Sequence, residues 1–198
     1  RLVADFHRRA DKVASGHGSV KIRKLNWDEN FQQTREFIGK SISRKQFGFI
    51  KDKTNNFIKY NKDLFNKRIK DGKIRDCHGD LHSGNIFVAD KIYIFDAIEF
   101  NERFRYVDTA SEIAFMSMDL DFHGREDLSR YFVSEYVRYS DDEELLKLLN
   151  FYKCYLAYVR GKVISFTRNK NAYNVARKYF RLSEMYSRLL ITEPSLIV

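Results

Sequence analysis

The sequence is poor in the residues that mark linkers, disulfide frameworks and membrane spans. It holds one proline in 198 residues, which argues against a disordered linker protein. Its two cysteines, Cys77 and Cys154, are too few for a disulfide framework, so we predict a reducing, cytoplasmic compartment. No run approaches the ~18 consecutive apolar residues of a membrane helix, and the first residues lack the apolar core of a signal peptide. We therefore expect no membrane partner.

What the chain does hold is enough apolar material for a core and an uneven distribution of charge. Hydrophobic residues make up 43% of it, and the length suits one domain or one lobe of a larger protein. Residues 1–75 hold 20 Lys and Arg against 8 Asp and Glu, residues 76–146 hold 6 against 17, and residues 147–198 hold 10 against 2. An acidic middle between basic flanks suits a cation site that also attracts an anion, although solvated helix faces explain it equally well. A nucleic-acid binder more often has an unbroken basic face, so we expect no nucleic-acid partner.

Hydrophobic periodicity predicts three helices in the first third of the chain. The first runs from the start of the chain to a stop at Gly16, and the second begins near Asn26. The third starts after Ser43 and continues to the stop signal Asp71-Gly72. The side chains expected to face inward in the second and third helices are Trp27, Phe31, Phe37, Ile38, Phe47, Ile50, Phe57, Ile58, Phe65 and Ile69.

The period then changes from that of a helix to that of a strand. Residues 86–88 and 91–95, joined by a two-residue corner at Ala89-Asp90, predict a β-hairpin. From Asp108 to about Thr192 the pattern is helical again. The sequence therefore predicts an α+β fold that is mostly helical and carries one small hairpin.

Polar residues gather at the two ends of this hairpin, in the stretch CHGDLHSGNIFVADKIYIFD (residues 77–96). Phosphoryl transfer from ATP needs Mg²⁺ held by hard oxygen ligands, and a carboxylate that orients the acceptor hydroxyl and takes its proton. Asp80 can supply that carboxylate. The hairpin brings Asn85 and Asp96 together as two oxygen ligands for the metal, and Gly79 and Gly84 permit tight turns beside them.

Several of these motifs resemble one known group of enzymes. HGDLHSGN resembles the catalytic loop of the aminoglycoside phosphotransferase and choline kinase superfamily, which has a protein-kinase-like fold. IFDAIEFNERFRYVDTA is similar to its metal-binding segment, and Asp96, Asp108 and Ala110 keep the spacing of that segment. DCHGDLH, FDAIEFNERFRY, MDLDFHGR and FYKCYLAYVRGKV are similar to a bacterial branch that is sometimes fused to a P-loop kinase-like domain. The resemblance covers residues 75–170.

The resemblance implies a role for each polar residue. Asp80 corresponds to the catalytic base, and Asn85 and Asp96 correspond to the residues that bind Mg²⁺ and, through it, ATP. His78 corresponds to a histidine that braces the catalytic loop. Asp108 would be structural, capping a helix and tethering that loop. The implied activity is ATP-dependent transfer of the γ-phosphoryl group to a hydroxyl of a small molecule.

Other uses of residues in this region stay open. Two interpretations stay open for His82 and for Glu99. His82 either packs in the loop or contacts the substrate, and Glu99 is either an ordinary polar loop residue or contacts the metal or the substrate. His78, His82 and Asp96 would make a three-ligand zinc set, but the flanking glycines disfavour the helix that such spacing needs. Cys77 is better explained as a buried, inert thiol than as a nucleophile.

The first 24 residues bear on where ATP binds. GHGSVKIRK (residues 16–24) lacks the third glycine and the preceding strand of a phosphate loop, so we predict a helix end followed by a loop. A kinase fold binds ATP mainly through a β-rich N-terminal lobe. RLVADFHRRA resembles the helix that follows the hinge, so residues 1–198 are expected to form the C-terminal lobe, with the N-terminal lobe absent or supplied by a partner chain. Self-association through the uncovered surface is expected. The alternative is a truncated or non-catalytic binding module.

The acceptor itself is not predicted. In the family, the helices that follow the position of Asp141 build the acceptor site. YKCYLAYVRGKVISF (residues 152–166) combines aromatic residues on one face with basic residues around it, which suits either a core helix or the rim of a site for an anionic or sugar-like substrate. Acidic residues at 119–121 and 141–144 could instead serve a polycationic substrate, although basic residues dominate the last third.

Overall fold

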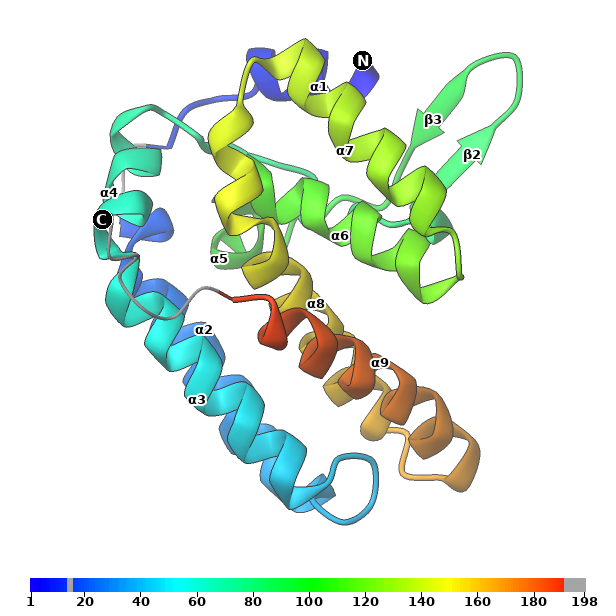
Figure 1. Ribbon diagram of the computed structural model, residues 1–198. Coiled ribbons are helices and arrows are strands. Elements are labelled where there is room, and N and C mark those ends of the chain that lie inside the picture. Colours follow the sequence, from blue (N-terminus) through cyan, green and yellow to red (C-terminus); the bar gives the residue numbers. More distant parts are fainter. Residues whose placement is uncertain (14–15, 191–198) are drawn as a thin grey trace.

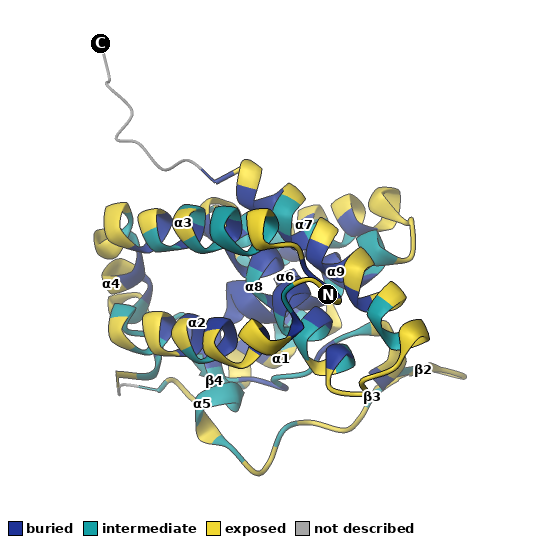
Figure 2. Cartoon of the chain, turned by 90° about the horizontal axis from the view of Figure 1, so that it is seen from below, coloured by how far each residue is buried: buried dark blue, intermediate teal, exposed yellow. Residues whose placement is uncertain are grey.

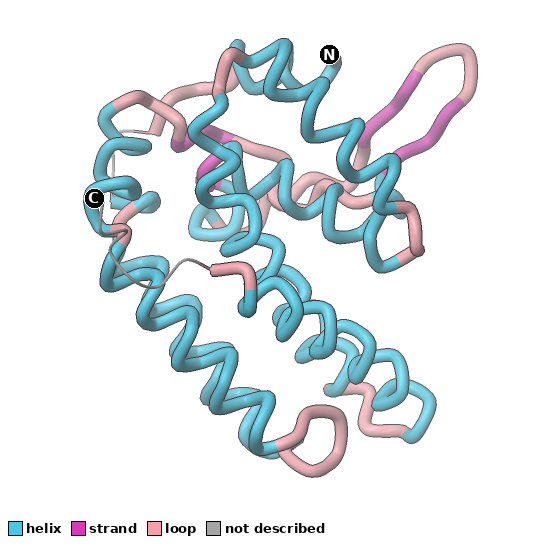
Figure 3. Tube along the Cα trace, in the orientation of Figure 1, coloured by secondary structure: helices cyan, strands magenta, loops and turns pink. Residues whose placement is uncertain are grey.

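The computed structural model describes residues 1–13 and 16–190, which form a mostly helical α+β fold as predicted. Strands in this part of the chain are confined to two short antiparallel pairs (Figure 3). In chain order the α-helices, strands and short 3₁₀ turns (η) are α1 (Leu2–Arg9), η1 (Gly16–Gly18), α2 (Val20–Thr34), η2 (Arg35–Phe37), α3 (Arg44–Tyr60), α4 (Lys62–Lys70), β1 (Ile74–Asp76), η3 (Ser83–Asn85), β2 (Ile86–Val88), β3 (Ile92–Ile94), α5 (Glu102–Arg105), β4 (Tyr106–Asp108), α6 (Thr109–Phe122), α7 (Glu126–Ser140), η4 (Glu143–Leu145), α8 (Leu146–Ser165) and α9 (Lys170–Arg188).

Helix α8 is the centre of the packing. It contacts α9 along its length, α6 on another side and α2 on a third (Figure 1). The helical hairpin of α2 and α3 runs beside the hairpin of α8 and α9, and buried residues line the faces between them (Figure 2). Aromatic contacts join these layers: Phe57 of α3 stacks on Phe151 of α8 with 4.9 Å between ring centroids, and Trp27 of α2 meets Tyr158 of α8 edge-on at 5.4 Å.

The predicted inward-facing residues are buried or partly buried. Three of the ten are only half-buried: Ile38, Phe47 and Ile69. The remaining seven form part of the core: Trp27, Phe31, Phe37, Ile50, Phe57, Ile58 and Phe65. Helical spacing of apolar residues therefore identified the buried faces of α2, α3 and α4.

The boundaries of the first helices differ from the prediction. Helix α1 ends at Arg9, well before Gly16. Helix α2 begins at Val20 rather than near Asn26, because the Ser19 hydroxyl accepts a hydrogen bond from the Ile22 amide and caps the helix there. Residues 20–24, predicted as a loop, are therefore helical, and no strand follows the glycines of η1.

The long third helix is in fact two helices, α3 and α4, that meet at Asn61. The Asn61 side-chain amide donates to the Phe57 carbonyl oxygen at 2.9 Å, and its backbone leaves the helical region with φ −110° and ψ 25°. An asparagine side chain that bonds to the backbone competes with the helical ladder in this way. The capping box at Ser43 and Gln46, by contrast, starts α3 where the prediction placed it.

The β-hairpin is present, with a slightly longer loop than predicted. Ile86 lies opposite Ile94 and Val88 opposite Ile92, so three residues rather than two connect β2 to β3. A second pair, β1 with β4, was not predicted, and it places Ile74 opposite Asp108. The predicted helices after Asp108 are α6 to α9, and their expected extension to Thr192 lies outside the described residues. None of the described helices combines the length and the apolar composition needed to cross a bilayer.

Candidate functional site

His78 joins the two ends of the predicted site. Its Nδ1 accepts a hydrogen bond from the Asp80 amide at 3.3 Å, so the ring proton lies on Nε2, which donates to the Phe95 carbonyl oxygen at 2.8 Å. The His78 carbonyl oxygen also accepts from the Ile98 amide at 2.9 Å. His78 thus braces the loop of residues 77–85 against the segment that follows β3.

Asn85 fixes the position of the Asp80 carboxylate. The Asn85 side-chain amide nitrogen donates to the Asp80 backbone carbonyl oxygen at 3.0 Å and to Asp80 Oδ2 at 3.1 Å. Both partners are acceptors, so the nitrogen must face them and the amide oxygen must point elsewhere. No donor from the described residues bonds to that oxygen. Asn85 is buried, whereas the Asp80 side chain is 34% exposed.

The Asp80 carboxylate is held in its charged form. Burial on its own would raise its pKa, but the nearby His82 imidazole, the Asn85 amide and the Arg160 charge together hold the pKa below its usual value. His82 Nδ1 accepts from the Gly84 amide at 3.1 Å, so its Nε2 carries the proton that faces Asp80 Oδ2, 3.5 Å away. His82 therefore contacts the candidate base directly as well as bracing the loop.

Asp96 stands at the other end of the hairpin in an uncommon backbone conformation. Its φ is 64°, in the left-handed region that non-glycine residues rarely occupy. Both backbone polar groups of the preceding residue, Phe95, are hydrogen-bonded: its amide donates to the Asn85 carbonyl oxygen at 3.1 Å, and its carbonyl oxygen accepts from His78. These contacts offset the cost of a strained residue, and they place Asp96 beside Asn85.

Helix α6 tethers the loop through two buried carboxylates: Glu112, which the sequence analysis did not mention, and Asp119, which it considered only as part of an acidic stretch for a polycationic substrate. Glu112 Oε2 accepts from the Gly79 amide at 2.8 Å, and its other oxygen accepts from His7 Nε2 at 2.9 Å. Asp119 Oδ2 accepts from the Ser83 amide at 2.9 Å and from the Ser83 hydroxyl. Two acidic residues seven apart in an apolar helix share one face, and that spacing was the available signal.

Gly79 is required where α6 meets the loop. Its φ is 83°, and a Cβ built on it would lie 2.8 Å from the Phe104 backbone oxygen. The sequence expectation that this glycine permits a tight turn is therefore confirmed.

Asp108 caps α6 as expected, but its side chain does not reach the loop. Its Oδ1 accepts from the Ala110 amide at 2.9 Å and lies 2.6 Å from Arg68 of α4, which also contacts Asp142 at 2.5 Å. All three charged groups of this triad are buried. Burial opposes the charge on Arg68, yet the two carboxylates raise its pKa above the usual value. The Asp108 side chain is thus engaged by Arg68 of α4, and Glu112 and Asp119 tether the loop instead.

Two cavities open on either side of residues 97 and 98. The α1 cavity, of about 700 Å³, lies between α1 and the hairpin and is lined by Phe6, His78 and Ile94 among others. The α8 cavity, of about 450 Å³, is lined by Asp80, Asp96 and residues of α2 and α8. Asp80 and Asp96 thus face one shared space.

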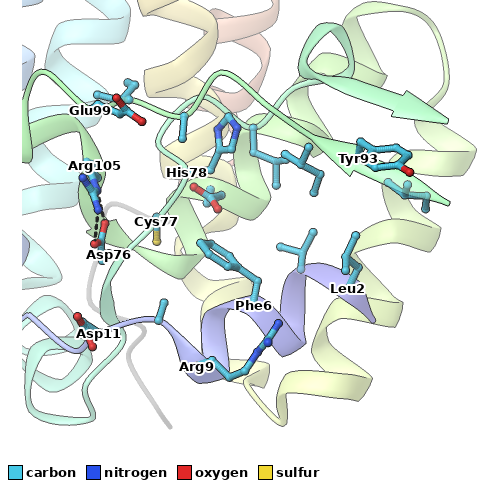
Figure 4. Close-up of a pocket in the computed structure, with 18 residues that line it drawn as sticks. Leu2, Phe6, Arg9, Asp11, Asp76, Cys77, His78, Tyr93, Glu99 and Arg105 are labelled. Atoms are coloured by element: carbon cyan, nitrogen blue, oxygen red, sulfur yellow. Dashed lines mark hydrogen bonds and ion pairs between the residues drawn. The ribbon is translucent and has the colours of Figure 1, made fainter. Parts of the chain in front are cut away.

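Glu99 belongs to the α1 cavity and not to the space that Asp80 and Asp96 share. It lies near Arg105, at the far side of that cavity from Leu2 and Tyr93 (Figure 4). The structure therefore brings together Asp80, Asn85, Asp96, His78 and His82, and it separates Glu99 and Asp108 from them.

The competing uses of this region receive no geometric support. Both ring nitrogens of His78 are engaged with backbone groups of the loop and of Phe95, which opposes a zinc-ligand role. Cys77 is buried, and burial raises the pKa of its thiol well above the usual value, as expected for an inert cysteine.

The oxygen donors at the base of the hairpin fit Mg²⁺. Asp96 is exposed and directly follows Phe95, whose amide bonds to the Asn85 backbone, and the Asn85 amide oxygen is turned away from its partners in Asp80. Carboxylate and amide oxygens are the hard ligands that Mg²⁺ prefers, and it keeps further sites for water and phosphate. Asn85 and Asp96 are therefore the residues that can hold this ion.

Comparisons with known proteins find relatives that cover most of the chain. It is 35% identical over 174 residues to an uncharacterised protein of Mycobacterium tuberculosis and to one of Mycobacterium bovis. The match covers 85% of this chain and 35% of each relative, so the chain spans 35% of the length of the curated relatives that it matches. No family model matches the sequence, and no solved structure matches the chain.

Proposed function

We propose that the protein is an ATP-dependent phosphotransferase that transfers the γ-phosphoryl group to a hydroxyl of a small molecule. The observation that carries this proposal is the position of Asp80. Its carboxylate is ionised, is held by Asn85 and His82, and lines one cavity together with Asp96. A charged carboxylate beside hard oxygen ligands is the arrangement that phosphoryl transfer to a hydroxyl requires.

In the proposed reaction the acceptor hydroxyl donates its hydrogen bond to Asp80. The hydroxyl oxygen forms a bond to the γ-phosphorus, the bond from that phosphorus to the bridging oxygen breaks, ADP leaves, and Asp80 takes the hydroxyl proton. A carboxylate with a lowered pKa is a weak base, so Asp80 acts mainly by orienting the hydroxyl. Mg²⁺ held by Asn85 and Asp96 would neutralise charge on the phosphate oxygens when bound.

The α1 cavity is the proposed place for the nucleotide. Apolar side chains such as Phe6, Leu81 and Ile94 line it, and they suit a planar base on the side of residues 97 and 98 away from the acceptor. Leu2, Phe6, Ile92 and Tyr93 are exposed along it. A further lobe, a partner chain or a second copy of this chain would cover such a rim, which is our proposal for how the nucleotide is enclosed.

Replacing Asp80 tests the function. In the natural full-length protein, Asp80→Asn should leave the fold intact and lower the turnover by about 10²–10⁴-fold, because the uncharged amide orients the acceptor hydroxyl less strongly and cannot take its proton. The measurement is release of ADP from ATP and Mg²⁺ with a panel of small hydroxyl compounds.

Asp90→Asn, at the exposed tip of the hairpin, is the matched control and should not change the rate. Equal turnover in Asp80→Asn and the native protein would overturn the proposal. Nucleotide binding without ADP release for any compound would favour the non-catalytic binding module.

A further inference from the structure

The α8 cavity contains a buried guanidinium group without a carboxylate partner. Arg23 of α2 lines this cavity and is only 4% exposed. One of its terminal nitrogens donates to the His17 carbonyl oxygen, and its Nε has no hydrogen-bond partner. Within the described ranges no carboxylate lies within 4.0 Å of it. A buried charge is costly unless something of opposite charge compensates it, so this group is suited to receive an anion.

A second arginine of the same cavity is also without an acidic partner. Arg160 of α8 lies 5.9 Å from the ring centroid of Tyr179, and no carboxylate of the described residues lies within 4.0 Å of it. Arg103, the third arginine of this cavity, differs, because it makes two hydrogen bonds of 2.9 and 2.7 Å to Glu29. Two of the three guanidinium groups therefore make no ion pair with a described carboxylate, although the charge of Arg160 acts at longer range on Asp80.

An unsatisfied acceptor lies one helical turn from Arg23. The Asn26 side-chain oxygen is buried, lines the α8 cavity and has no hydrogen-bond partner. Tyr155, Val159 and Val163 of α8 supply an apolar wall to the same space. The cavity thus offers cationic donors, one acceptor for a hydroxyl, and a surface for a carbon skeleton.

We propose that the α8 cavity binds the phosphoryl acceptor through an anionic group, a phosphate or a carboxylate, held by Arg23 and Arg160. This inference rests on the proposed function, because that function places a hydroxyl of the same molecule at Asp80. Guanidinium groups bind phosphates and carboxylates through paired, charge-assisted hydrogen bonds. A polycationic acceptor would meet the two unpaired arginines and is excluded.

Three sugars of one skeleton test the inference: ribose 5-phosphate, ribonate and ribose. They are titrated by calorimetry into the full-length protein without ATP or Mg²⁺, so the result does not depend on phosphoryl transfer. We expect one of the anionic sugars to bind at least about 10-fold more tightly than ribose, and the tighter of the two identifies the anion. The inference is overturned if neither anionic sugar binds more tightly than ribose. It is also overturned if none of the three sugars binds at concentrations up to about 10 mM.

Two variants locate the binding to the arginines. Arg23→Met and Arg160→Met should each weaken binding of the preferred anionic sugar by about 10-fold or more, because each removes a charge-assisted hydrogen bond. Arg130→Met, on the exposed side of α7, removes the same charge elsewhere and should change nothing. Unchanged affinity in both cavity variants overturns the inference.

Thermal unfolding separates ligand binding from a structural role. Because Arg23 has no acidic partner, Arg23→Met should shift the melting temperature by less than about 4 °C. A larger fall would show that Arg23 stabilises the fold. The Arg160→Met variant would then decide the inference, because the Arg160 side chain is only half-buried. Anion binding that persists while Asp80→Asn retains full turnover would contradict the proposed function alone.

Discussion

At the scale of single residues, the contact between His82 and Asp80 predicts a pH dependence. Burial opposes the charge on Asp80, and His82 is the first of the groups that reverse this effect and lower its pKa. The charged form is then present at pH values above that lowered pKa and is lost only as the pH falls through it. In His82→Ala, burial still raises the pKa of Asp80 but the main group that lowers it is gone. The pKa of Asp80 should therefore rise, and the acid limb of the turnover profile should move to higher pH.

The control is His82→Gln, whose side-chain amide can still donate to the Asp80 carboxylate. Its acid limb should lie between those of the native protein and His82→Ala. A profile that is identical in all three proteins would show that His82 does not set the charge of Asp80.

At the scale of elements, helix α6 determines how rigidly the loop of residues 77–85 is held. Asp119→Ala leaves the Ser83 amide and hydroxyl without their acceptor, and an unsatisfied pair of this kind should lower the free energy of unfolding by about 1–3 kcal/mol. Turnover should fall as well, because Asp80 lies in the loop that this contact fixes. Denaturant unfolding measures the loss of stability, ADP release measures the turnover, and hydrogen exchange of the Ser83 amide reports whether the tether itself is lost.

Asp127→Ala is the comparison, since Asp127 is an exposed carboxylate paired with Arg125 on the surface. Its unfolding curve should match that of the native protein. Slow exchange of the Ser83 amide in Asp119→Ala would contradict the tethering role.

The contrast between the hairpin and this tether explains what the sequence could predict. The hairpin lies within 20 residues, so the change of period was sufficient to predict it and to bring Asn85 and Asp96 to one end of it. The bracing role of His78 was expected from the resemblance of HGDLHSGN and not from spacing. Glu112 and Asp119 act from 33 and 36 residues away, and only the packing of α6 reveals their partners. The start of α2 was missed because a single serine cap decides it.

At the scale of the whole molecule, the triad of Arg68, Asp108 and Asp142 joins α4, the start of α6 and the segment before α8. Removing one partner of a buried ion pair leaves the other charge uncompensated. Asp108→Ala should therefore lower the free energy of unfolding by about 3–5 kcal/mol, measured by urea denaturation.

Asp71→Ala, which removes an exposed ion pair with Lys67 on the same helix α4, should leave the urea midpoint unchanged. A loss below about 1 kcal/mol in Asp108→Ala would mean that the triad contributes little to the union of these three elements. The two cavities could not be predicted from the sequence, because residues of α1, α2 and α8 meet the hairpin segment only in the folded chain.

The backbone hydrogen bonds of Phe95 limit which substitutions this position can accept. The amide and carbonyl oxygen of Phe95 hold the Asn85 and His78 sides of the site together, while the residue as a whole is 51% exposed. The backbone at this position is constrained and the side chain is not, so many residue types should be accepted there and proline, which lacks the amide hydrogen, should be rejected. A search for functional positions by the invariance of their residue type would therefore miss residue 95, although its backbone is hydrogen-bonded to both Asn85 and His78.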